Sequence, residues 1–299
     1  VAGFRHIGGL VGVNDAAVYN ASSAGIITVT SNISTSPVFD ALNNNYHSGG
    51  QNIGGLIGTT YNNGTFATIY NSTSTTDINV NGNISGLFGF GSNATIGGFI
   101  GNNNTFVDNT AVVGNTSQGD VTFTGNLSAN GGANIGGFIG SGYTNEVLPI
   151  VQAATSSGNV LVNGDSSGSY LNAGSFIGGF SGSMLNVGSS GNTTVNMNAT
   201  TITQTIYNTN TNTYESVNTN AGFNIGGFVG TYDGFPSNQG IDTATSSGNV
   251  SYTGVLTGLT NSGSYLNLGG FVGSSRGHIT NVTSSGAVLL TVDATVNSG

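Results

Sequence analysis

The stretch LGGFVGSSRGHITNVTSSGAVLLTV at residues 268–292 contains the two motifs that decide the fold. The first motif, LGGFVG at 268–273, recurs along the whole chain as IGGLVG at 7–12, IGGLIG at 53–58, IGGFIG at 96–101, IGGFIG at 135–140, IGGFSG at 177–182 and IGGFVG at 225–230. The intervals between the first residues of successive copies are 46, 43, 39, 42, 48 and 43. Self-similarity at a nearly fixed period is the signature of a repeat architecture. The chain therefore consists of seven tandem repeats of about 43 residues.

A second motif follows each copy of the first and has the pattern of a β-strand. Besides VTSSGAVLLTV at 282–292, it occurs as ASSAGIITVT at 21–30, STSTTDINVNG at 72–82, NTSQGDVTFTG at 115–125, ATSSGNVLVNG at 154–164, VGSSGNTTVNM at 187–197 and ATSSGNVSYTG at 244–254. After a short Ser/Gly turn, apolar residues alternate with polar ones, as Val160 and Val162 do, which is typical of a half-buried strand. No segment has a helical period, and the abundant Gly, Asn and β-branched residues are poor helix formers.

Two strand-bearing pieces per repeat favour a parallel β-solenoid, or β-helix, with two coils of about 21 residues in each repeat. The expected fold is one all-β domain over 1–299 with about 14 coils, and a spacing of about 4.8 Å per coil predicts a rod of roughly 65–70 Å. A β-propeller is the main alternative, because a blade has a similar period. Variable insertions, and a Gly pair inside the apolar segment, favour the solenoid.

Stacked coils place equivalent residues above one another along the axis. The fourth residue of the first motif is apolar in every copy, and these side chains are expected to form one core ladder: Leu10, Leu56, Phe99, Phe138, Phe180, Phe228 and Phe271. An Asn directly precedes four copies of the motif, which predicts a turn ladder of side-chain amides: Asn52, Asn134, Asn224 and Asn267.

The composition excludes several classes of function. Two Arg and no Lys stand against 11 acidic residues, for a net charge of −9, and only 4% of the chain is charged. Binding to nucleic acid or to an anionic membrane surface needs several cations. No apolar run approaches the roughly 20 residues that span a bilayer, so membrane insertion is not expected. The absence of Cys excludes disulfides and thiolate metal sites.

The opening stretch resembles the GLUG repeat of large bacterial and archaeal surface proteins. Its Gly-Phe-Val-Gly core, Gly turn, Ile-Thr-Asn segment and Ser-Gly-Ala-Val strand match that family in order at 270–273, 277, 279–281 and 285–288. The resemblance covers nearly the whole chain and weakens at the loops 37–50, 83–95, 141–153 and 199–222, while Phe replaces the usual Leu in five of seven copies. It implies a right-handed β-helix, an extracellular or cell-surface location in adhesin-type proteins, and no catalytic residues in the repeats.

No residue pattern points to catalysis, a cofactor or a metal site. His6, His47 and His278 lie in different contexts whose spacing supports no metal triad. Polysaccharide lyases need a cation and glycosidases need paired carboxylates, whereas the acids are spread over different repeats: Asp108, Asp120, Asp165, Asp233 and Asp242. Calcium binding stays open at Asn163-Gly164-Asp165 and Asp233-Gly234, although no nonapeptide calcium repeat occurs. We expect no enzyme activity and no cofactor.

Two kinds of surface chemistry are also considered. Thr pairs such as Thr193-Thr194 share no fixed repeat position, which does not favour an ice-binding array. Thirteen Asn-x-Ser/Thr sequons are candidate glycosylation sites: Asn20, Asn32, Asn63, Asn71, Asn83, Asn93, Asn103, Asn115, Asn126, Asn192, Asn198, Asn249 and Asn281.

The two ends of the chain continue each other's pattern. VNSG at 296–299 followed by VAGFRHIGGLVG at 1–12 reads like TNSGSYLNLGGFVG at 260–273. This favours either a window of a longer array or identical subunits that stack end to end into a filament. We expect a structural extracellular fibre or adhesin-stalk protein whose partners are copies of itself or further repeats. The alternative is a lectin-like module that stacks glycans on Tyr143, Tyr207, Tyr214, Tyr232 and Tyr265; a polysaccharide-active enzyme ranks third.

Overall fold

The structure is a computed structural model that describes residues 5–30, 32–34, 38–40, 45–47, 51–61, 68–85, 93–105, 111–128, 131–144, 149–200, 202–208, 213–219, 221–234, 240–257 and 265–295. Within these residues the regular structure is β-strand throughout, and no helix occurs. The expected all-β fold is confirmed.

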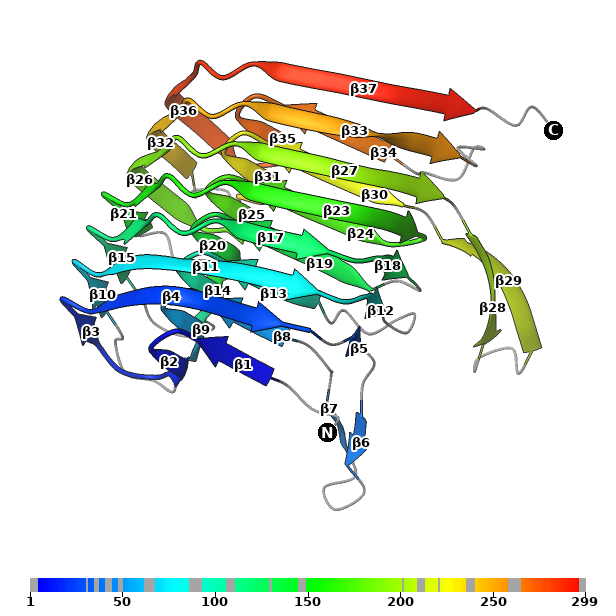
Figure 1. The fold of residues 1–299 in the computed structure, drawn as a ribbon, viewed down its shortest axis with the longest axis horizontal. Coiled ribbons are helices and arrows are strands. Elements are labelled where there is room, and N and C mark those ends of the chain that lie inside the picture. The colour runs from blue at the N-terminus through cyan, green and yellow to red at the C-terminus, as the bar shows by residue number, and fades with distance from the viewer. Residues whose placement is uncertain are drawn as a thin grey trace.

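Three parallel sheets, which we name A, B and C, form the body of the molecule (Figure 1). Sheet A contains β1 (Arg5–Gly8), β8 (Gln51–Gly54), β13 (Asn93–Gly97), β19 (Gly132–Gly136), β24 (Tyr170–Gly174), β30 (Gly222–Gly226) and β34 (Tyr265–Gly269). Sheet B contains β2 (Val11–Asn14), β9 (Ile57–Tyr61), β14 (Ile100–Thr105), β20 (Ile139–Thr144), β25 (Ile177–Ser181), β31 (Val229–Tyr232) and β35 (Val272–Ser275).

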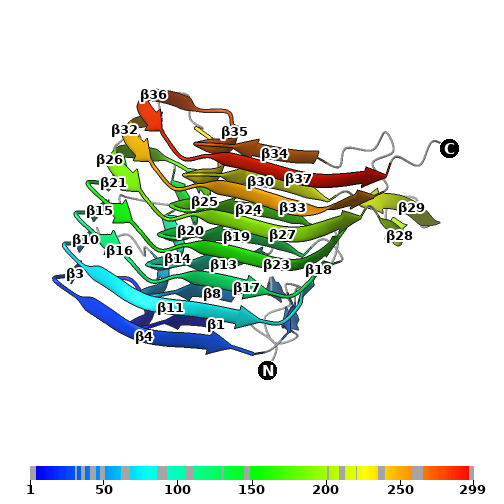
Figure 2. The same cartoon turned by 45° about the horizontal axis from the view of Figure 1, so that its top comes forward.

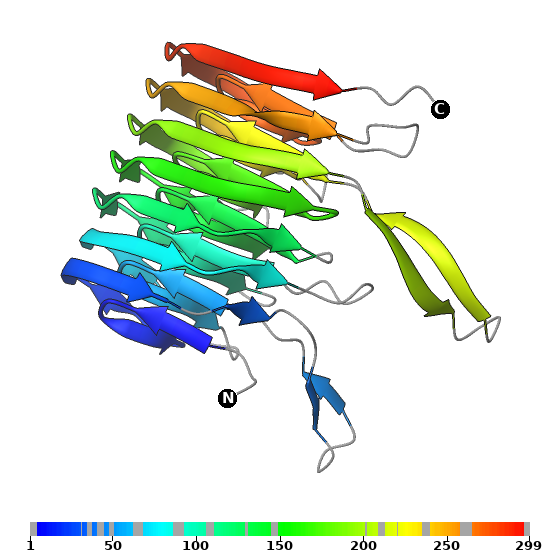
Figure 3. The ribbon, with the colours of Figure 1, turned by 45° about the vertical axis from the view of Figure 1, so that its right-hand side comes forward.

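Sheet C is made of shorter and longer strands from every repeat. Its members are β3 (Val18–Tyr19), β4 (Ser22–Val29), β5 (Ile33–Ser34), β10 (Thr68–Tyr70), β11 (Thr73–Asn81), β12 (Ile84–Ser85), β15 (Ala111–Val113), β16 (Thr116–Ser117), β17 (Val121–Thr124), β18 (Leu127–Ser128), β21 (Pro149–Gln152), β22 (Thr155–Ser156), β23 (Val160–Ser167), β26 (Ser183–Ser189), β27 (Thr193–Thr200), β32 (Gly240–Ser246), β33 (Val250–Thr257), β36 (His278–Ser284) and β37 (Val288–Thr295). Two antiparallel hairpins project from the body (Figure 3): β6 (Val38–Asp40) with β7 (Asn45–His47), and β28 (Ile202–Asn208) with β29 (Thr213–Thr219).

Neighbouring strands in each sheet come from neighbouring repeats. Ile53 pairs with Ile96, 43 residues later, and Ile135 pairs with Ala173, 38 residues later. One repeat therefore makes one full turn through sheets A, B and C, and the chain winds as a parallel solenoid (Figure 2). We number its coils 1 to 7, as residues 5–34, 51–85, 93–128, 132–167, 170–200, 222–257 and 265–295.

The expectation of two coils per repeat, about 14 in all, is wrong. The two motifs of one repeat lie in different sheets of the same coil, so they do not stack on each other. Seven coils at about 4.8 Å each make a stack of about 34 Å, half the expected length. The propeller alternative is wrong as well, because its blades would pair strands within one repeat rather than between repeats.

The two motifs face each other across the interior of a coil. In coils 1 to 6 the Ser at one register position of the second motif is buried, and two hydrophobic clusters lie inside the coils, one behind sheet A and one behind sheet B. In coil 6, Ser246 Oγ donates a 2.9 Å hydrogen bond to the carbonyl oxygen of Gly227, the second glycine of the first motif. In coil 7, Ser284 Oγ donates to Gly270 in the same way, at 2.8 Å. This contact links the two motifs within coils 6 and 7.

The aromatic core ladder exists, with two corrections. The rings of Phe99, Phe138, Phe176, Phe228 and Phe271 stack with centroids 4.6–4.9 Å apart and nearly parallel planes. In coil 5 the ladder residue is Phe176 and not Phe180, because the position equivalent to Ile135 is Ala173, four residues before the string IGGF at 177–180 begins. Phe180 is also buried, but on β25, where it pairs with Tyr232. Leu56 is buried in coil 2, whereas Leu10 in coil 1 is 52% exposed.

The predicted amide ladder is confirmed on the strands of sheet A rather than at a turn. Asn267 Nδ2 donates to Asn224 Oδ1 at 2.8 Å, Asn224 to Asn172 at 2.9 Å, and Asn172 to Asn134 at 2.7 Å. Nearer the start, Thr95 Oγ1 donates to Asn52 Oδ1 at 2.6 Å. Side-chain hydrogen bonds thus add to the backbone ladder between coils 2 and 3 and from coil 4 to coil 7.

The first and third glycines of the first motif lie where backbones of adjacent coils meet. A Cβ on Gly97 would overlap the carbonyl oxygen of Ile100 and lie 2.5 Å from the amide nitrogen of Gly140 in the next coil. Real Cβ atoms do not approach other atoms so closely, so both positions are Gly in all seven coils. The second position admits one exception, Ser175 in coil 5, whose Oγ lies 2.6 Å from Ser189 Oγ.

A different corner lies within sheet C. At one register position every coil has a left-handed residue, with φ between 50° and 68°: Asn20, Asn71, Gly114, Ala153, Asn186, Thr243 and Asn281. Asn is the non-glycine residue that most readily adopts this conformation. The corner directly follows the short strand of sheet C in coils 1 to 4 and lies within β26, β32 and β36 in coils 5 to 7.

Candidate interaction surfaces

The outer face of sheet C carries rows of polar side chains that run along the solenoid axis. Parallel in-register pairing stacks equivalent residues, and one outward row contains a Thr in five coils: Thr73, Thr116, Thr155, Thr245 and Thr283. Ser22 and Gly188 fill this row in the two remaining coils. The expectation that Thr shares no fixed repeat position is therefore wrong for this row.

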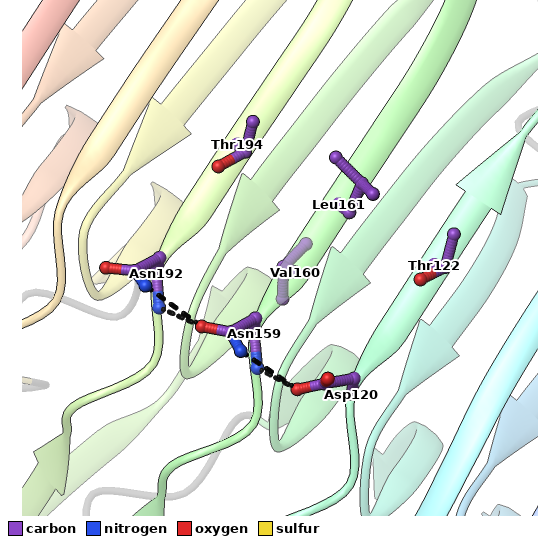
Figure 4. Close-up of a pocket in the computed structure, with 7 residues that line it drawn as sticks. All are labelled: Asp120, Thr122, Asn159, Val160, Leu161, Asn192 and Thr194. Carbon is purple, nitrogen blue, oxygen red and sulfur yellow. Dashed lines mark hydrogen bonds between the residues drawn. The ribbon is translucent and has the colours of Figure 1, made fainter.

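A second row on the same face is an Asp/Asn ladder. It contains Asp77, Asp120, Asn159, Asn192 and Asn249 in coils 2 to 6. Each Oδ1 accepts a hydrogen bond from the backbone amide of the next coil, at 2.7–3.0 Å. In the middle of the ladder the side chains also bond directly, since Asn192 Nδ2 donates to Asn159 Oδ1 at 3.1 Å (Figure 4).

A shallow hollow of about 310 Å³ lies over this ladder. Figure 4 shows its lining from three coils: Asp120, Thr122, Asn159, Val160, Leu161, Asn192 and Thr194. One carboxylate, two amides and two hydroxyls surround the apolar Leu161 and Val160. Such a lining suits a neutral ligand rich in hydroxyl groups, because it contains no cation that would hold an anion.

The two end coils form a second kind of surface. Eight of the ten exposed large hydrophobic side chains of the described residues lie in coils 1 and 7: Leu10, Val13, Tyr19, Ile26, Tyr265, Val288, Leu289 and Leu290. Inward-facing residues such as Val288 and Leu290 are half exposed because no coil covers them. The outermost strands, such as β4 and β37, also carry backbone groups along an edge that no strand of the described chain pairs.

The candidate glycosylation sites differ in the exposure of their Asn side chains. Nine are exposed: Asn20, Asn32, Asn71, Asn83, Asn126, Asn192, Asn198, Asn249 and Asn281. Asn103 and Asn115 are fully buried, and Asn115 Nδ2 donates to the carbonyl oxygen of Ile69 at 2.8 Å, so neither can carry a glycan in the folded protein. Asn63 and the side chain of Asn93 lie outside the described residues.

The proposed tyrosine platform is not a single surface. Tyr232 is fully buried, and its hydroxyl donates to the carbonyl oxygen of Gly182 at 2.8 Å; burial raises its pKa, with a contribution from Asp233. Tyr143 and Tyr265 are exposed, while the side chains of Tyr207 and Tyr214 lie outside the described residues.

Sequence reasoning missed an exposed tyrosine pair on sheet C. Tyr19 and Tyr70 are register partners in coils 1 and 2, with ring centroids 6.5 Å apart. Their common position at the end of the short strand, directly before the left-handed corner, was the only signal that could have identified them.

The titratable residues do not gather into a site. Among the residues that the structure describes, no three His, Cys, Asp or Glu side chains lie close enough together to hold a metal ion. His6 Nδ1 lies 3.1 Å from Asn52 Nδ2, and partial burial lowers the pKa of His6. His278 is exposed on β36, whereas Asp108 and the side chain of His47 lie outside the described residues.

The acids on sheet C take part in bonds between coils. Asp165 Oδ1, in the Asn-Gly-Asp stretch considered for calcium, accepts a hydrogen bond from Asn198 Nδ2 at 2.8 Å. Asp242 Oδ1 accepts hydrogen bonds from Asn281 Nδ2 at 2.9 Å and Thr280 Oγ1 at 3.0 Å, which lower the pKa of Asp242.

No protein-family model matches the chain, and neither the curated proteins nor the solved structures yielded a match. The likeness to GLUG repeats therefore stays a prediction from the motifs. Within the described residues, no helix has the length and apolar character needed to cross a bilayer.

Proposed function

We propose that this chain is a structural shaft module of an extracellular or cell-surface fibre, extended at its ends by further coils of the same design. The single observation that supports this role most is the pair of open end coils, where unpaired strand edges coincide with exposed core residues. Natural solenoids need such ends covered to stay soluble. The covering coils come either from the same polypeptide or from another copy.

The shaft role also suits the way the coils are joined. Neighbouring coils are joined by backbone hydrogen bonds in three sheets, to which the Phe stack adds in coils 3 to 7, the Asn bonds of sheet A in coils 4 to 7 and the Asp/Asn ladder in coils 2 to 7. A force along the axis is shared among all of these bonds. Mechanical continuity requires no cofactor and no catalytic step.

Location and handedness are parts of the proposal. An extracellular site is supported by the likeness to surface-protein repeats, and the exposed sequons would serve there as glycan acceptors. A right-handed coil is supported by the general rule that connections between parallel strands of one sheet are right-handed in nearly all proteins.

A tandem chain in which residue 299 of one copy is joined to residue 1 of the next tests the shaft role. If the ends are built to be extended, β37 of the first copy and β4 of the second become as protected from hydrogen exchange as β23, an interior strand that serves as the internal standard. Junction strands that exchange as fast as the ends of the single chain would contradict the proposal.

Glycan binding is a second candidate, supported by the exposed Tyr19–Tyr70 pair. Exposed tyrosines next to the amides of Asn20 and Asn71 suit the apolar face and hydroxyl rim of a sugar. A glycan array followed by calorimetry tests it. Tyr70→Ala should abolish binding while Tyr265→Ala, an equally exposed tyrosine in coil 7, should not; an array without hits would reject this function.

A further inference from the structure

We infer that the open face of coil 7 binds the open face of coil 1 in a second copy of this chain, in the register that continues all three sheets. This inference rests on the proposed function and names the partner of the end faces. The register follows from the chain itself, since each sheet position recurs once per coil. Leu268 would lie on Ile7, Phe271 on Leu10, and Val288 on Ile27 of the second copy.

The strongest support comes from a row of sheet C that changes character only at the ends. In coils 2 to 6 the ladder position on sheet C is Asp or Asn, but it is Ile26 in coil 1 and Ala287 in coil 7. Ile26 is 68% exposed. Lack of a covering coil exposes inward residues, but it does not explain an apolar residue at an outward position.

One other row changes in the same way. The sheet B row, which is Thr59 in coil 2 and Thr231 in coil 6, begins in coil 1 with the exposed Val13. The row of Leu289 does not, because it already contains Leu161 in coil 4.

Stacking the two copies would bring these apolar residues together. Ile26 of the second copy would lie on Ala287, the smallest side chain of its row, with Leu289 two residues along the same strand. Burial of apolar surface is the main favourable term in protein association, and the size difference between Ile and Ala lets the pair fit.

One pair of opposite charges would face each other across the contact. Arg276 follows β35 and donates its backbone amide to the carbonyl oxygen of Tyr232, as Asp233 does to that of Phe180. The equivalent position in coil 1 is Asp15, directly after β2. In the stacked register, Arg276, one of two cations in the chain, lies one coil below Asp15 of the second copy.

Disulfide trapping tests the register, because the chain contains no Cys. Thr283 and Ser22 occupy the same outward row in coils 7 and 1, so the stack would place their Cα atoms about 4.8 Å apart, within disulfide range. The double variant Thr283→Cys/Ser22→Cys should form a ladder of covalent head-to-tail oligomers on oxidation. Each single variant should stop at dimers.

Two matched pairs control the trapping experiment. Thr245→Cys/Thr283→Cys joins adjacent coils of one chain and should close an intramolecular disulfide. This result would show that Cys residues at neighbouring positions of the row can form a disulfide. Thr283→Cys/Thr28→Cys places the second Cys six residues out of register, about 20 Å away, and should give no ladder. A ladder from this pair as strong as from the first, or no ladder from the first while the intramolecular pair closes, would overturn the inference.

Charge reversal gives an independent readout by sedimentation. Arg276→Glu should weaken self-association about 3- to 10-fold, since it replaces an attraction by a repulsion at the rim of the contact, and adding Asp15→Arg should restore it. Failure of rescue, or a wild-type chain that stays monomeric at high concentration, would overturn the inference. A protected junction in the tandem chain would then still support the shaft role, so the two failures are distinguishable.

Discussion

Each coil makes two turns of a special kind, and they constrain the sequence in different ways. At the turn between sheets A and B, the first and third positions are Gly in all seven coils. At the left-handed corner of sheet C, the seven coils use Asn, Gly, Ala and Thr at a nearly constant φ of 50° to 68°. The residue type is therefore constrained more strictly at the turn between sheets A and B than at the corner with the left-handed dihedral.

The environment of each turn explains this difference. Backbone atoms of two neighbouring strands occupy the space that a Cβ on Gly97 would need, so no adjustment of one side chain relieves the overlap. At the corner, a Cβ on Gly114 would meet nothing closer than 3.9 Å. A residue with a Cβ is strained there by about 1–2 kcal/mol but still fits.

The largest expected effect comes from Gly97→Ala. The added Cβ forces sheets A and B apart in coils 3 and 4, and we expect a loss of about 4 kcal/mol or more, measured as a lower urea midpoint together with local loss of hydrogen-exchange protection. Gly240→Ala on β32 is the control, because its nearest atom would be at an ordinary 3.4 Å. Equal effects of the two variants would refute close approach as the reason for glycine.

Phe138→Ala measures the stability gained from the aromatic stack, which the turn between sheets A and B positions inside the coil. The ring stacks between Phe99 and Phe176 and is fully buried, so its removal should cost about 3–5 kcal/mol. Phe271→Ala removes the half-buried ring at the end of the stack and should cost clearly less. If both cost the same in the isolated chain, the stack does not gain its stability from burial between coils.

Part of this arrangement could be predicted from the sequence, because a string that recurs every 43 residues or so must place equivalent residues in register. The coil count was wrong because strand patterns do not say which face a strand opposes. The pairing of equivalent strands in neighbouring repeats, and hydrogen bonds such as that from Ser246 to Gly227, show that both motifs belong to one coil. Phe176 was missed because Ser175 replaces the second glycine, while the intact string two residues later misplaced the ladder onto Phe180.

The surfaces were harder to predict than the core. The left-handed corner has no shared side chain, so Ala153 and Thr243 look unrelated to Asn71 until their φ values are compared. The proposed contact between the end faces rests on Ile26 and Ala287, which are the two apolar members of an otherwise Asp/Asn row. That row becomes visible only when the register is known.

Opposite substitutions at the corner should give opposite, smaller effects. Gly114→Ala adds a Cβ at φ of 68° without a steric contact and should cost about 1 kcal/mol, while Ala153→Asn places a residue that tolerates this conformation and should add about 0.5–1 kcal/mol. Thermal midpoints of both variants give the comparison. A loss from Gly114→Ala as large as that from Gly97→Ala would mean that the two turns are equally strict.

The smallest expected effect is electrostatic and concerns the corner of coil 7. Asn281 and Thr280 donate hydrogen bonds to Asp242 and lower its pKa below the ordinary value of 3.8. A lowered pKa in the folded state means that these bonds stabilise the protein above pH 3.8 and that the contribution is lost as the pH falls through the folded-state pKa. Asp242→Asn should therefore lower the thermal midpoint at neutral pH and make no difference in strong acid. Asn281→Ala removes the main donor, so it should move the pKa of Asp242, followed by carboxyl NMR, back toward its ordinary value; a pKa that stays low would assign the shift to other groups, of which Thr280 is the next donor.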